Sequence, residues 1–223
     1  MSGIPYTTIS VSGADAFAFL QAQLASDMRA VSRQQALRSA WCNPKGRVIC
    51  TPSIVASDAG FELALPSDLA TLVLERLTLF RFRSRVNFAM TTAAGRSDEE
   101  QRAQLQAGIV EITLAQSEKF TPHMLNLDLL HIVSLDKGCY PGQEIVARTH
   151  YRGASKRRCL RFESRAPVAA GDKVSDGERD IGEVVNAIGT DLLAVVPVEQ
   201  ADQSLFVDGV GLSRRDLPYA IGP

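Results

Sequence analysis

The spacing of apolar residues changes towards the C-terminus, and this change constrains the fold more than any other feature of the chain. Short apolar runs follow one another there, at residues 159–162, 181–188 and 192–198. Turns rich in glycine and aspartate separate these runs, a pattern that is typical of a small all-β barrel or sandwich. We therefore expect a body over residues 1–155 and a C-terminal β-barrel over residues 156–223.

The first 155 residues combine helical and strand periodicity, which predicts an α+β body. Strand patterns occur at residues 4–11, 36–42, 47–56, 61–65 and 109–114. Helical patterns occur at residues 14–28 and 97–108, and the second of these begins with a capping box. Two further helices are expected, one with Ser67 as its N-cap and one after the turn at Pro141. The 36–42 and 47–56 strands flank a turn, and we expect them to pair.

Residues 80–88 alternate strictly between apolar and polar side chains. The period of two predicts a half-buried strand with Arg81, Arg83 and Arg85 on one face. That face would meet a carboxylate or phosphate ligand, or it would be an ordinary solvated strand face. The mutual repulsion of three like charges on one face favours an anion nearby.

The charge of the chain is unevenly distributed. With 45% hydrophobic and 22% charged residues the chain can form a packed core, and its net charge of −1 argues against a globally basic nucleic-acid-binding protein. Residues 137–158 carry six basic residues and one acidic residue, whereas residues 159–223 carry six basic and eleven acidic residues. The two segments either neutralise each other or leave a face that attracts anions. Because Tyr140, His150 and Tyr151 lie among its basic residues, the 137–158 segment is also a candidate for direct tRNA contact.

We expect a cytoplasmic protein without a membrane segment. The N-terminus lacks the basic and apolar regions of a secretory signal, and no stretch approaches the roughly 18 apolar residues of a membrane helix. The four cysteines, at positions 42, 50, 139 and 159, form neither a Cys-x-x-Cys pair nor a Cys/His spacing typical of zinc. No stable metal is therefore expected. No phosphate loop, dinucleotide fingerprint or serine-hydrolase elbow is present in the sequence.

The octapeptide 137–144, Lys-Gly-Cys-Tyr-Pro-Gly-Gln-Glu, contains the residues most suited to chemistry. Its Tyr140–Gln143 part has the composition of a type II turn, with proline at the first central position and glycine at the second, which requires a positive φ. The following residues would open a helix with Glu144 in its first turn. A thiol before a helix N-terminus and near Lys137 tends to have a lowered pKa, which favours a reactive Cys139. The alternative is a surface turn whose cysteine is a small buried hydrophobe.

The octapeptide and the residues that follow it, up to Gly153, resemble the signature of the YgfZ-type folate-binding proteins. These are relatives of the T-protein (aminomethyltransferase) of the glycine cleavage system. The resemblance runs nearly from end to end. Val11–Asp27 is similar to the family's opening helix, and Asn43–Arg47 is similar to its first turn. Gly182–Val184 and Leu217–Tyr219 resemble its barrel motifs.

The resemblance implies a T-protein-like, folate-binding α+β body followed by a small C-terminal β-barrel. It implies tetrahydrofolate as the cofactor and an accessory role in iron–sulfur cluster assembly or repair, and thereby in the support of tRNA-modifying iron–sulfur enzymes. Iron–sulfur assembly proteins or client enzymes would be the partners. Cys139 would be the functional thiol. The residues that would line or support the folate cleft are Lys137, Tyr140, Gln143, Glu144 and Arg148, with Arg148 or the arginine row meeting the folate carboxylates.

Two departures from the T-protein pattern bear on activity. T-proteins carry an acidic pair just after the first turn, whereas the matching residues 46–51 contain no carboxylate. The region between Phe88 and Ile109 is also short, and the T-protein segment that holds the pterin has no counterpart there. We therefore expect no aminomethyl transfer. A folate-dependent one-carbon transferase is the first alternative function, and an RNA-binding module is the second.

Overall fold

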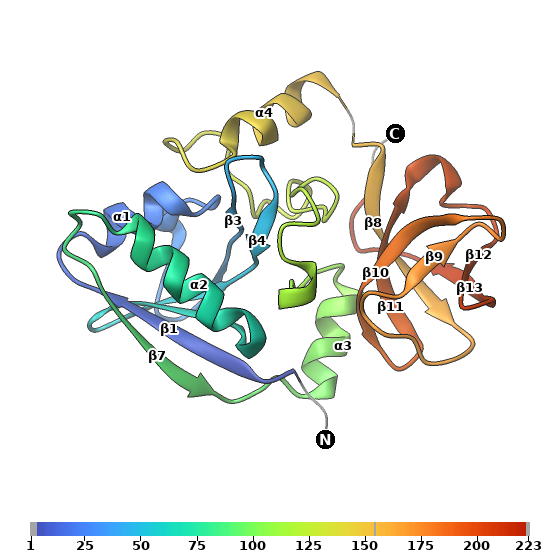
Figure 1. Ribbon diagram of the computed structural model, residues 1–223, viewed down its shortest axis with the longest axis horizontal. Helices are drawn as coiled ribbons and strands as arrows, with labels where there is room; N and C mark the ends of the chain where they lie inside the picture. The colour runs from blue at the N-terminus through green and yellow to red at the C-terminus, as the bar shows by residue number, and fades with distance from the viewer. Residues whose placement is uncertain (1–3, 154, 222–223) are drawn as a thin grey trace.

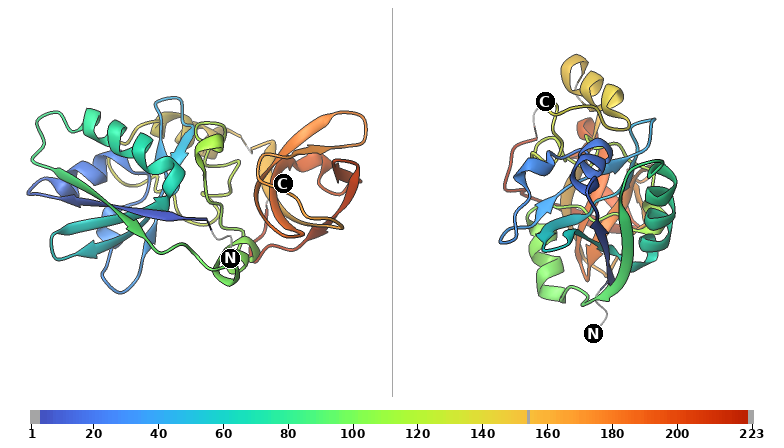
Figure 2. Two further views of the ribbon diagram at one scale, coloured as in Figure 1. Left: turned by 60° about the horizontal axis from the view of Figure 1, so that its bottom comes forward. Right: turned by 90° about the vertical axis from the view of Figure 1, so that its left-hand side faces the viewer.

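The computed structural model describes residues 4–153 and 155–221, and it consists of an α+β body joined to a closed β-barrel (Figure 1). The barrel lies beside one end of the body, as a second view confirms (Figure 2). In the described ranges, no helix is long and apolar enough to cross a membrane.

A five-stranded antiparallel sheet forms the centre of the body, with the strand order β2-β5-β6-β1-β7. Its strands are β1 (Tyr6–Ser12), β2 (Leu37–Arg38), β5 (Ser53–Ser57), β6 (Gly60–Pro66) and β7 (Asn87–Ala93). Ile9 of β1 lies opposite Leu63 of β6 on one side and Met90 of β7 on the other. Buried residues alternate with partly exposed ones along most of β1, as expected for a strand with one face on the core.

Four α-helices occur in the described part of the chain: α1 (Ala16–Gln23), α2 (Ser67–Phe80), α3 (Asp98–Gln106) and α4 (Gln143–Arg152). Short 3-10 turns occur at Met28–Ala30, Leu114–Gln116 and Val198–Gln200. α2 buries Leu69, Val73 and Leu77, which lie one turn apart, and it packs on β1 and β6. The predicted capping box, formed by Ser97 and Glu100, begins α3.

A separate hairpin of β3 (Trp41–Cys42) and β4 (Val48–Cys50) carries the Asn43–Arg47 turn at its tip. The predicted pairing around this turn is confirmed, although the two runs divide between sheets. β2 pairs with β5 in the large sheet, and β3 pairs with β4 in the hairpin. The irregular chain that follows α3 lies between this hairpin and the barrel (Figure 1).

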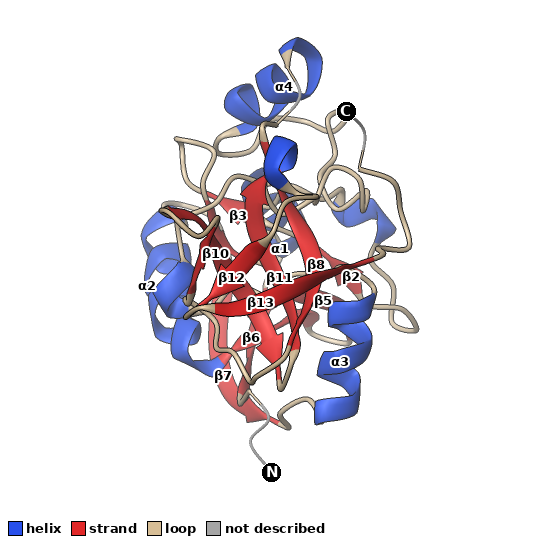
Figure 3. Ribbon diagram, turned by 90° about the vertical axis from the view of Figure 1, so that its right-hand side faces the viewer, coloured by secondary structure: helices blue, strands red, loops and turns tan. Residues whose placement is uncertain are grey.

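Six strands close the C-terminal barrel in the order β10-β11-β8-β13-β12-β9 (Figure 3). They are β8 (Arg157–Ser164), β9 (Lys173–Ser175), β10 (Asp180–Ile188), β11 (Asp191–Pro197), β12 (Leu205–Val207) and β13 (Val210–Arg215). The prediction of an α+β fold with a C-terminal barrel is thus confirmed. We propose 1–155 and 156–223 as the two domains, a division supported by the start of β8 at Arg157.

Both faces of β11 are buried, which joins the barrel to the body. Leu192, Ala194 and Val196 belong to the core inside the barrel, whereas Leu193 and Val195 belong to the core of the body. Because successive side chains of a strand point to opposite faces, the same strand serves both cores. The position of the barrel on the body is therefore fixed by hydrophobic packing.

Residues 80–88 do not form the predicted strand with an arginine face. α2 includes the first of these residues, the chain then turns, and β7 begins only at Asn87. Phe82 has a φ of 44° and is 83% exposed, which does not fit a strand residue facing a core. Arg85 pairs with Asp15. The alternation of phenylalanine and arginine therefore reflects a helix end and a turn.

The predicted strand at 109–114 is also wrong, although this segment contains buried residues. The side chain of Asn186 accepts a hydrogen bond from the backbone N–H of Glu111 at 2.9 Å and donates one to its carbonyl at 2.8 Å. The hydroxyl of Thr51 accepts from the N–H of Ile112 at 3.1 Å. Side chains therefore take the place of a partner strand.

Two helix boundaries differ from the predictions. α1 ends at Gln23, well before the predicted residue 28, and Leu24 is already extended. Ser67 lies in the first turn of α2 and is not its N-cap. Its hydroxyl is hydrogen-bonded to that of Thr7 at 2.8 Å, so a tertiary contact replaces the expected cap.

Candidate functional site

The octapeptide forms the turn that its composition predicts. Gly142 has φ 78° and ψ 0°, the values of the second central residue of a type II turn. The N–H of Gln143 donates to the carbonyl of Tyr140 at 3.1 Å, and α4 begins at Gln143. We call residues 137–142, which carry Cys139, the thiol loop.

The thiol loop and the start of α4 lie at the tip of the β3–β4 hairpin (Figure 1), and two glycines allow the close approach. A Cβ added to Gly142 would lie 2.5 Å from the carbonyl oxygen of Asn43. A Cβ added to Gly46 would lie 2.9 Å from the Cβ of Ile145, and Gly46 also has a positive φ of 68°. Only glycine combines this φ with such a close approach at low cost. The two segments that carry most of the resemblance therefore pack directly on each other.

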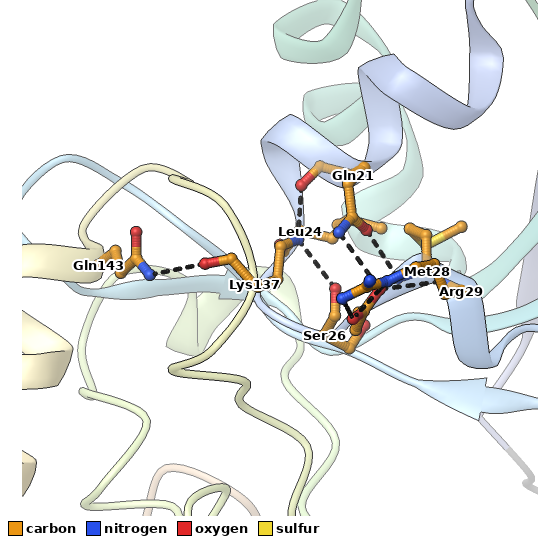
Figure 4. A network of polar contacts seen from close by, with 8 residues as sticks. Gln21, Leu24, Ser26, Met28, Arg29, Lys137 and Gln143 are labelled. Atoms are coloured by element: carbon orange, nitrogen blue, oxygen red, sulfur yellow. Dashed lines mark hydrogen bonds and ion pairs between the residues drawn. The ribbon is translucent and has the colours of Figure 1, made fainter.

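Lys137 fastens the start of the thiol loop to the end of α1 (Figure 4). Its ammonium donates to the carbonyl oxygens of Gln21, Leu24 and Ser26, the last two at 2.6 and 2.9 Å. Carbonyls beyond a helix end need donors, and a cation is favourable there. Burial lowers the pKa of Lys137 to about 8, so the ammonium remains charged at neutral pH. With its ammonium held by three carbonyls, Lys137 supports the loop.

Cys139 is exposed, whereas the cysteines at positions 42, 50 and 159 are buried. Burial raises the pKa of Cys42 to about 12, and it raises the pKa of Cys50 and of Cys159 as well. Those three thiols stay protonated and unreactive at neutral pH. Within the described residues, Cys139 is therefore the one thiol that a partner or reagent can reach.

Tyr140 lies buried beside the exposed thiol. The Lys137 ammonium nitrogen is 5.5 Å from the centroid of its ring, a cation–π contact. Its hydroxyl has no hydrogen-bond partner in the described part of the chain, and burial raises the pKa of Tyr140. Tyr140 thus packs under the loop as a neutral phenol.

The other predicted cofactor residues lie on α4. The amide of Gln143 donates to the carbonyl of Lys137 at 3.4 Å, which ties the helix start to the loop. Glu144 and Arg148 are exposed, and neither takes part in an ion pair with another described residue. No residue of 137–148 lines any of the cavities that we describe. Their direct contact with folate stays a prediction.

A cleft of about 400 Å³ lies between the body and the barrel. We call it the body–barrel cleft. Phe120, Met124 and Val195 form apolar parts of its wall. The charged residues of the wall are Arg47, Lys119, Arg157, Lys173, Asp180 and Glu183. Its volume falls within the range of roughly 300–1,000 Å³ that is usual for small-molecule sites, and its four cations outnumber its two carboxylates.

The positive charge of this cleft is only partly compensated. Glu183 pairs with Lys119 at 2.8 Å and with Lys173 at 2.6 Å. Burial raises the pKa of Glu183, but the hydrogen bonds from the two lysines outweigh this effect and lower it. Arg47 and Arg157 have no carboxylate partner among the described residues, and they donate to backbone carbonyls of Lys119 and Ile181. The cleft is therefore suited to an anionic ligand.

Glu118 places a carboxylate beside the body–barrel cleft, and sequence reasoning missed this residue. It lies with Asn43, Lys45 and Arg47 in the wall of an open hollow next to the cleft. Both carboxylate oxygens accept from Arg76 at 3.0 Å, and one also accepts from the Asn43 amide at 2.9 Å. The hydrogen bonds from Arg76 hold the pKa of Glu118 below its usual range. Residues 46–51, which match the acidic position of T-proteins, contain no carboxylate, and no motif marks Glu118.

The basic 137–158 segment does not form one open cationic face. Arg158 is buried and forms two hydrogen bonds to the Asp128 carboxylate, at 2.7 and 3.1 Å. Arg157 donates to the carbonyl of Ile181. Lys137 is buried as well, so Lys137 and Arg158, two of the six basic residues, are committed within the protein, which weakens the prediction of RNA contact through them.

Several known proteins are similar to this chain, although no protein-family model matches it. An uncharacterized protein of Haemophilus influenzae is 28% identical over 97% of this chain and 96% of its own length. The tRNA-modifying protein YgfZ of Yersinia pseudotuberculosis is 29% identical over 99% of this chain and 94% of its own length. The aligned region with that protein is 311 positions long, against the 223 residues of this chain, so the relative carries insertions.

Two further comparisons concern a sequence match over about half of this chain and a structural match over nearly all of it. The tRNA-modifying protein YgfZ of Sodalis glossinidius is 39% identical over 133 residues, which cover 53% of this chain and 40% of the relative. The crystal structure of the glycine cleavage system aminomethyltransferase T from Bartonella henselae superposes with a TM-score of 0.73. It covers 96% of this chain and 83% of the other, at 15% sequence identity, which shows a common fold.

Proposed function

We propose that this chain, a homologue of the proteins named tRNA-modifying protein YgfZ with the fold of aminomethyltransferase T, is a folate-binding accessory protein for iron–sulfur enzymes. In this role it supports the assembly or repair of iron–sulfur clusters, including those of tRNA-modifying enzymes. Cys139 is the residue through which it acts on a cluster or on a partner.

One observation carries this proposal: among the described residues, a single accessible thiol sits on a loop that is fastened at both ends. Lys137 holds the start of the loop on α1, and Gly142 holds its end on the hairpin. A thiol held on a rigid support is suited to bind a soft metal centre or to react in a defined direction. A cysteine needed only for packing would be buried, as the other three described cysteines are.

The body–barrel cleft fits tetrahydrofolate better than the surface of α4 does. A folate has a flat pterin and a glutamate tail with carboxylates. In the cleft, Phe120 and Met124 offer apolar contacts for the pterin, and arginines without a carboxylate partner are available for the tail. Arg47 and Arg157 would bind the carboxylates. Bound tetrahydrofolate would supply a carrier for a one-carbon group. Through Gly46, the turn that carries Arg47 also contacts the helix that follows the thiol loop.

Calorimetric titration with tetrahydrofolate tests this assignment. We expect saturable binding to the unmodified protein, and we expect Arg47→Gln to weaken it at least about tenfold, because a charge-assisted hydrogen bond contributes about 1.5–3 kcal/mol. Arg148→Gln is the matched control, since Arg148 is the exposed arginine that the sequence predicts for the same carboxylates. Its affinity should change less than about twofold.

The reverse ranking of the two variants would place the folate on α4 and contradict the cleft assignment. No heat of binding at high micromolar tetrahydrofolate would remove the cofactor from the proposal.

Glu118 favours a second candidate, a folate-dependent one-carbon transferase, because it offers a carboxylate beside the cleft. Both of its oxygens are already bonded to Arg76, so the group is poorly placed to bind a folate amine as well. A turnover assay with a methylamine donor distinguishes the two functions. The accessory role predicts no turnover, whereas turnover that Glu118→Gln abolishes would establish the transferase.

A further inference from the structure

Two histidines and an aspartate from separate segments meet where the body joins the barrel. His123 and Asp128 lie in the run of turns after Phe120, and His150 lies in the last turn of α4. One ligand atom from each side chain lies within 4.8 Å of the others. No spacing in the sequence pointed to this group, and the proposed function does not use it.

The ring of His123 contributes an unpaired nitrogen to this group. Its side chain is only 3% exposed, and Nε2 has no hydrogen-bond partner among the described residues. The same nitrogen lies 3.9 Å from Oδ2 of Asp128. A buried polar atom without a partner calls for a ligand or a water.

Arg158 holds the carboxylate of Asp128 in its orientation. Its guanidinium donates to Oδ1 of Asp128 at 2.7 Å and to Oδ2 at 3.1 Å, and it also donates to the carbonyl of His123 at 2.7 Å. One side chain therefore fixes the carboxylate and the backbone of the buried histidine together. Contacts of this kind hold the ligands of metal sites in place. Each carboxylate oxygen keeps a second lone pair for an ion.

We propose that His123, Asp128 and His150 bind a divalent transition-metal ion. Two imidazoles and one carboxylate form a donor set of zinc and non-haem iron sites. Ion-to-donor distances of about 2.0–2.2 Å require donors about 3.4 Å apart, so the three groups must move slightly closer. His150 is exposed and can rotate to do so. The ion ties the end of α4 to the turns of the body, and a fourth position stays open for water or another ligand.

Titration with Zn²⁺ alone tests the site. The protein is the full chain with Cys139→Ala, freed of metal by a chelator and desalted, so that the exposed thiol cannot bind the ion. We expect one Zn²⁺ per chain by calorimetry, with an affinity in the micromolar range or tighter. In this background, His150→Gln should weaken binding by about 100-fold or more, since even the partners of metal ligands contribute 10- to 100-fold.

His131→Gln is the matched control. His131 is an exposed histidine near His123 in sequence, and it is not part of the cluster. Zn²⁺ should raise the melting temperature of the parent and of this control, but not that of His150→Gln. Because His150 is exposed, its variant should keep the native circular dichroism spectrum. Absence of Zn²⁺ binding by the parent, or equal affinities of the two histidine variants, would overturn the proposal.

Discussion

Replacing Cys139 by alanine is expected to abolish the ability of this protein to restore iron–sulfur enzyme activity in a strain that lacks its homologue. The physical reason is that Cys139 is the one accessible thiol of the described chain, while burial raises the pKa of the other three cysteines. The free energy of unfolding should change by less than about 0.5 kcal/mol, because an exposed side chain contributes little to the core. Enzyme activity in cell extracts and urea unfolding of the purified variant measure the two effects.

Serine at the same position separates thiol chemistry from polarity. Cys139→Ser keeps the size and the hydrogen-bonding ability of the side chain but removes the soft, nucleophilic sulfur. It should fail as completely as the alanine variant. His131→Gln, an exposed substitution elsewhere on the body, should restore full activity. Full restoration by Cys139→Ala would remove the thiol from the proposed function.

Gly142→Ala is expected to lower the free energy of unfolding by about 2–4 kcal/mol. A left-handed φ costs a residue with a Cβ about 1–2 kcal/mol, and the φ of Gly142 is 78°. The added Cβ would also lie 2.5 Å from the backbone oxygen of Asn43, so the thiol loop or the hairpin must shift. Urea unfolding followed by circular dichroism gives the change, and we expect weaker iron–sulfur support because the loop moves.

Gly138→Ala provides the control in the same loop. Apart from Gly138 itself and its two chain neighbours, no described residue has a heavy atom within 4 Å of an added Cβ at this position, and the φ of Gly138 is not in the left-handed region. This substitution should change the stability by less than about 0.5 kcal/mol. Equal stabilities of the two alanine variants would show that the contact with the hairpin does not hold the loop.

The features that sequence predicts best in this chain are those set by neighbouring residues. Pro141 and Gly142 determine a type II turn because their φ preferences match its two central positions. Ser97 and Glu100 determine the start of α3 because their side chains satisfy the free N–H groups there. The short apolar runs and the turns between them in the C-terminal part predict the barrel for the same local reason.

The failed predictions involve partners that are distant in sequence. The segment at Glu111 lacks a strand partner because Asn186, 75 positions later, satisfies its backbone. α1 ends early where Lys137, more than 110 positions away, binds the carbonyls at its end. The alternation in residues 80–88 fits a strand or a helix followed by a turn, and the packing of α2 on the sheet decides between them.

The site follows the same rule. Its motif residues could be named in advance, but their division into supports and accessible groups could not, because burial depends on the whole fold. Lys137 looked like a partner for the thiol, and its ammonium is held by α1. The body–barrel cleft, the carboxylate of Glu118 and the histidine cluster are all formed by segments that no local pattern connects.

A crystal structure of the protein with saturating tetrahydrofolate tests the central claim most directly. We predict the folate in the body–barrel cleft, with its pterin against Phe120 and a tail carboxylate within hydrogen-bond distance of Arg47 or Arg157. Folate bound along α4 at Arg148, or an empty cleft at a ligand concentration that saturates the protein in solution, would contradict the account.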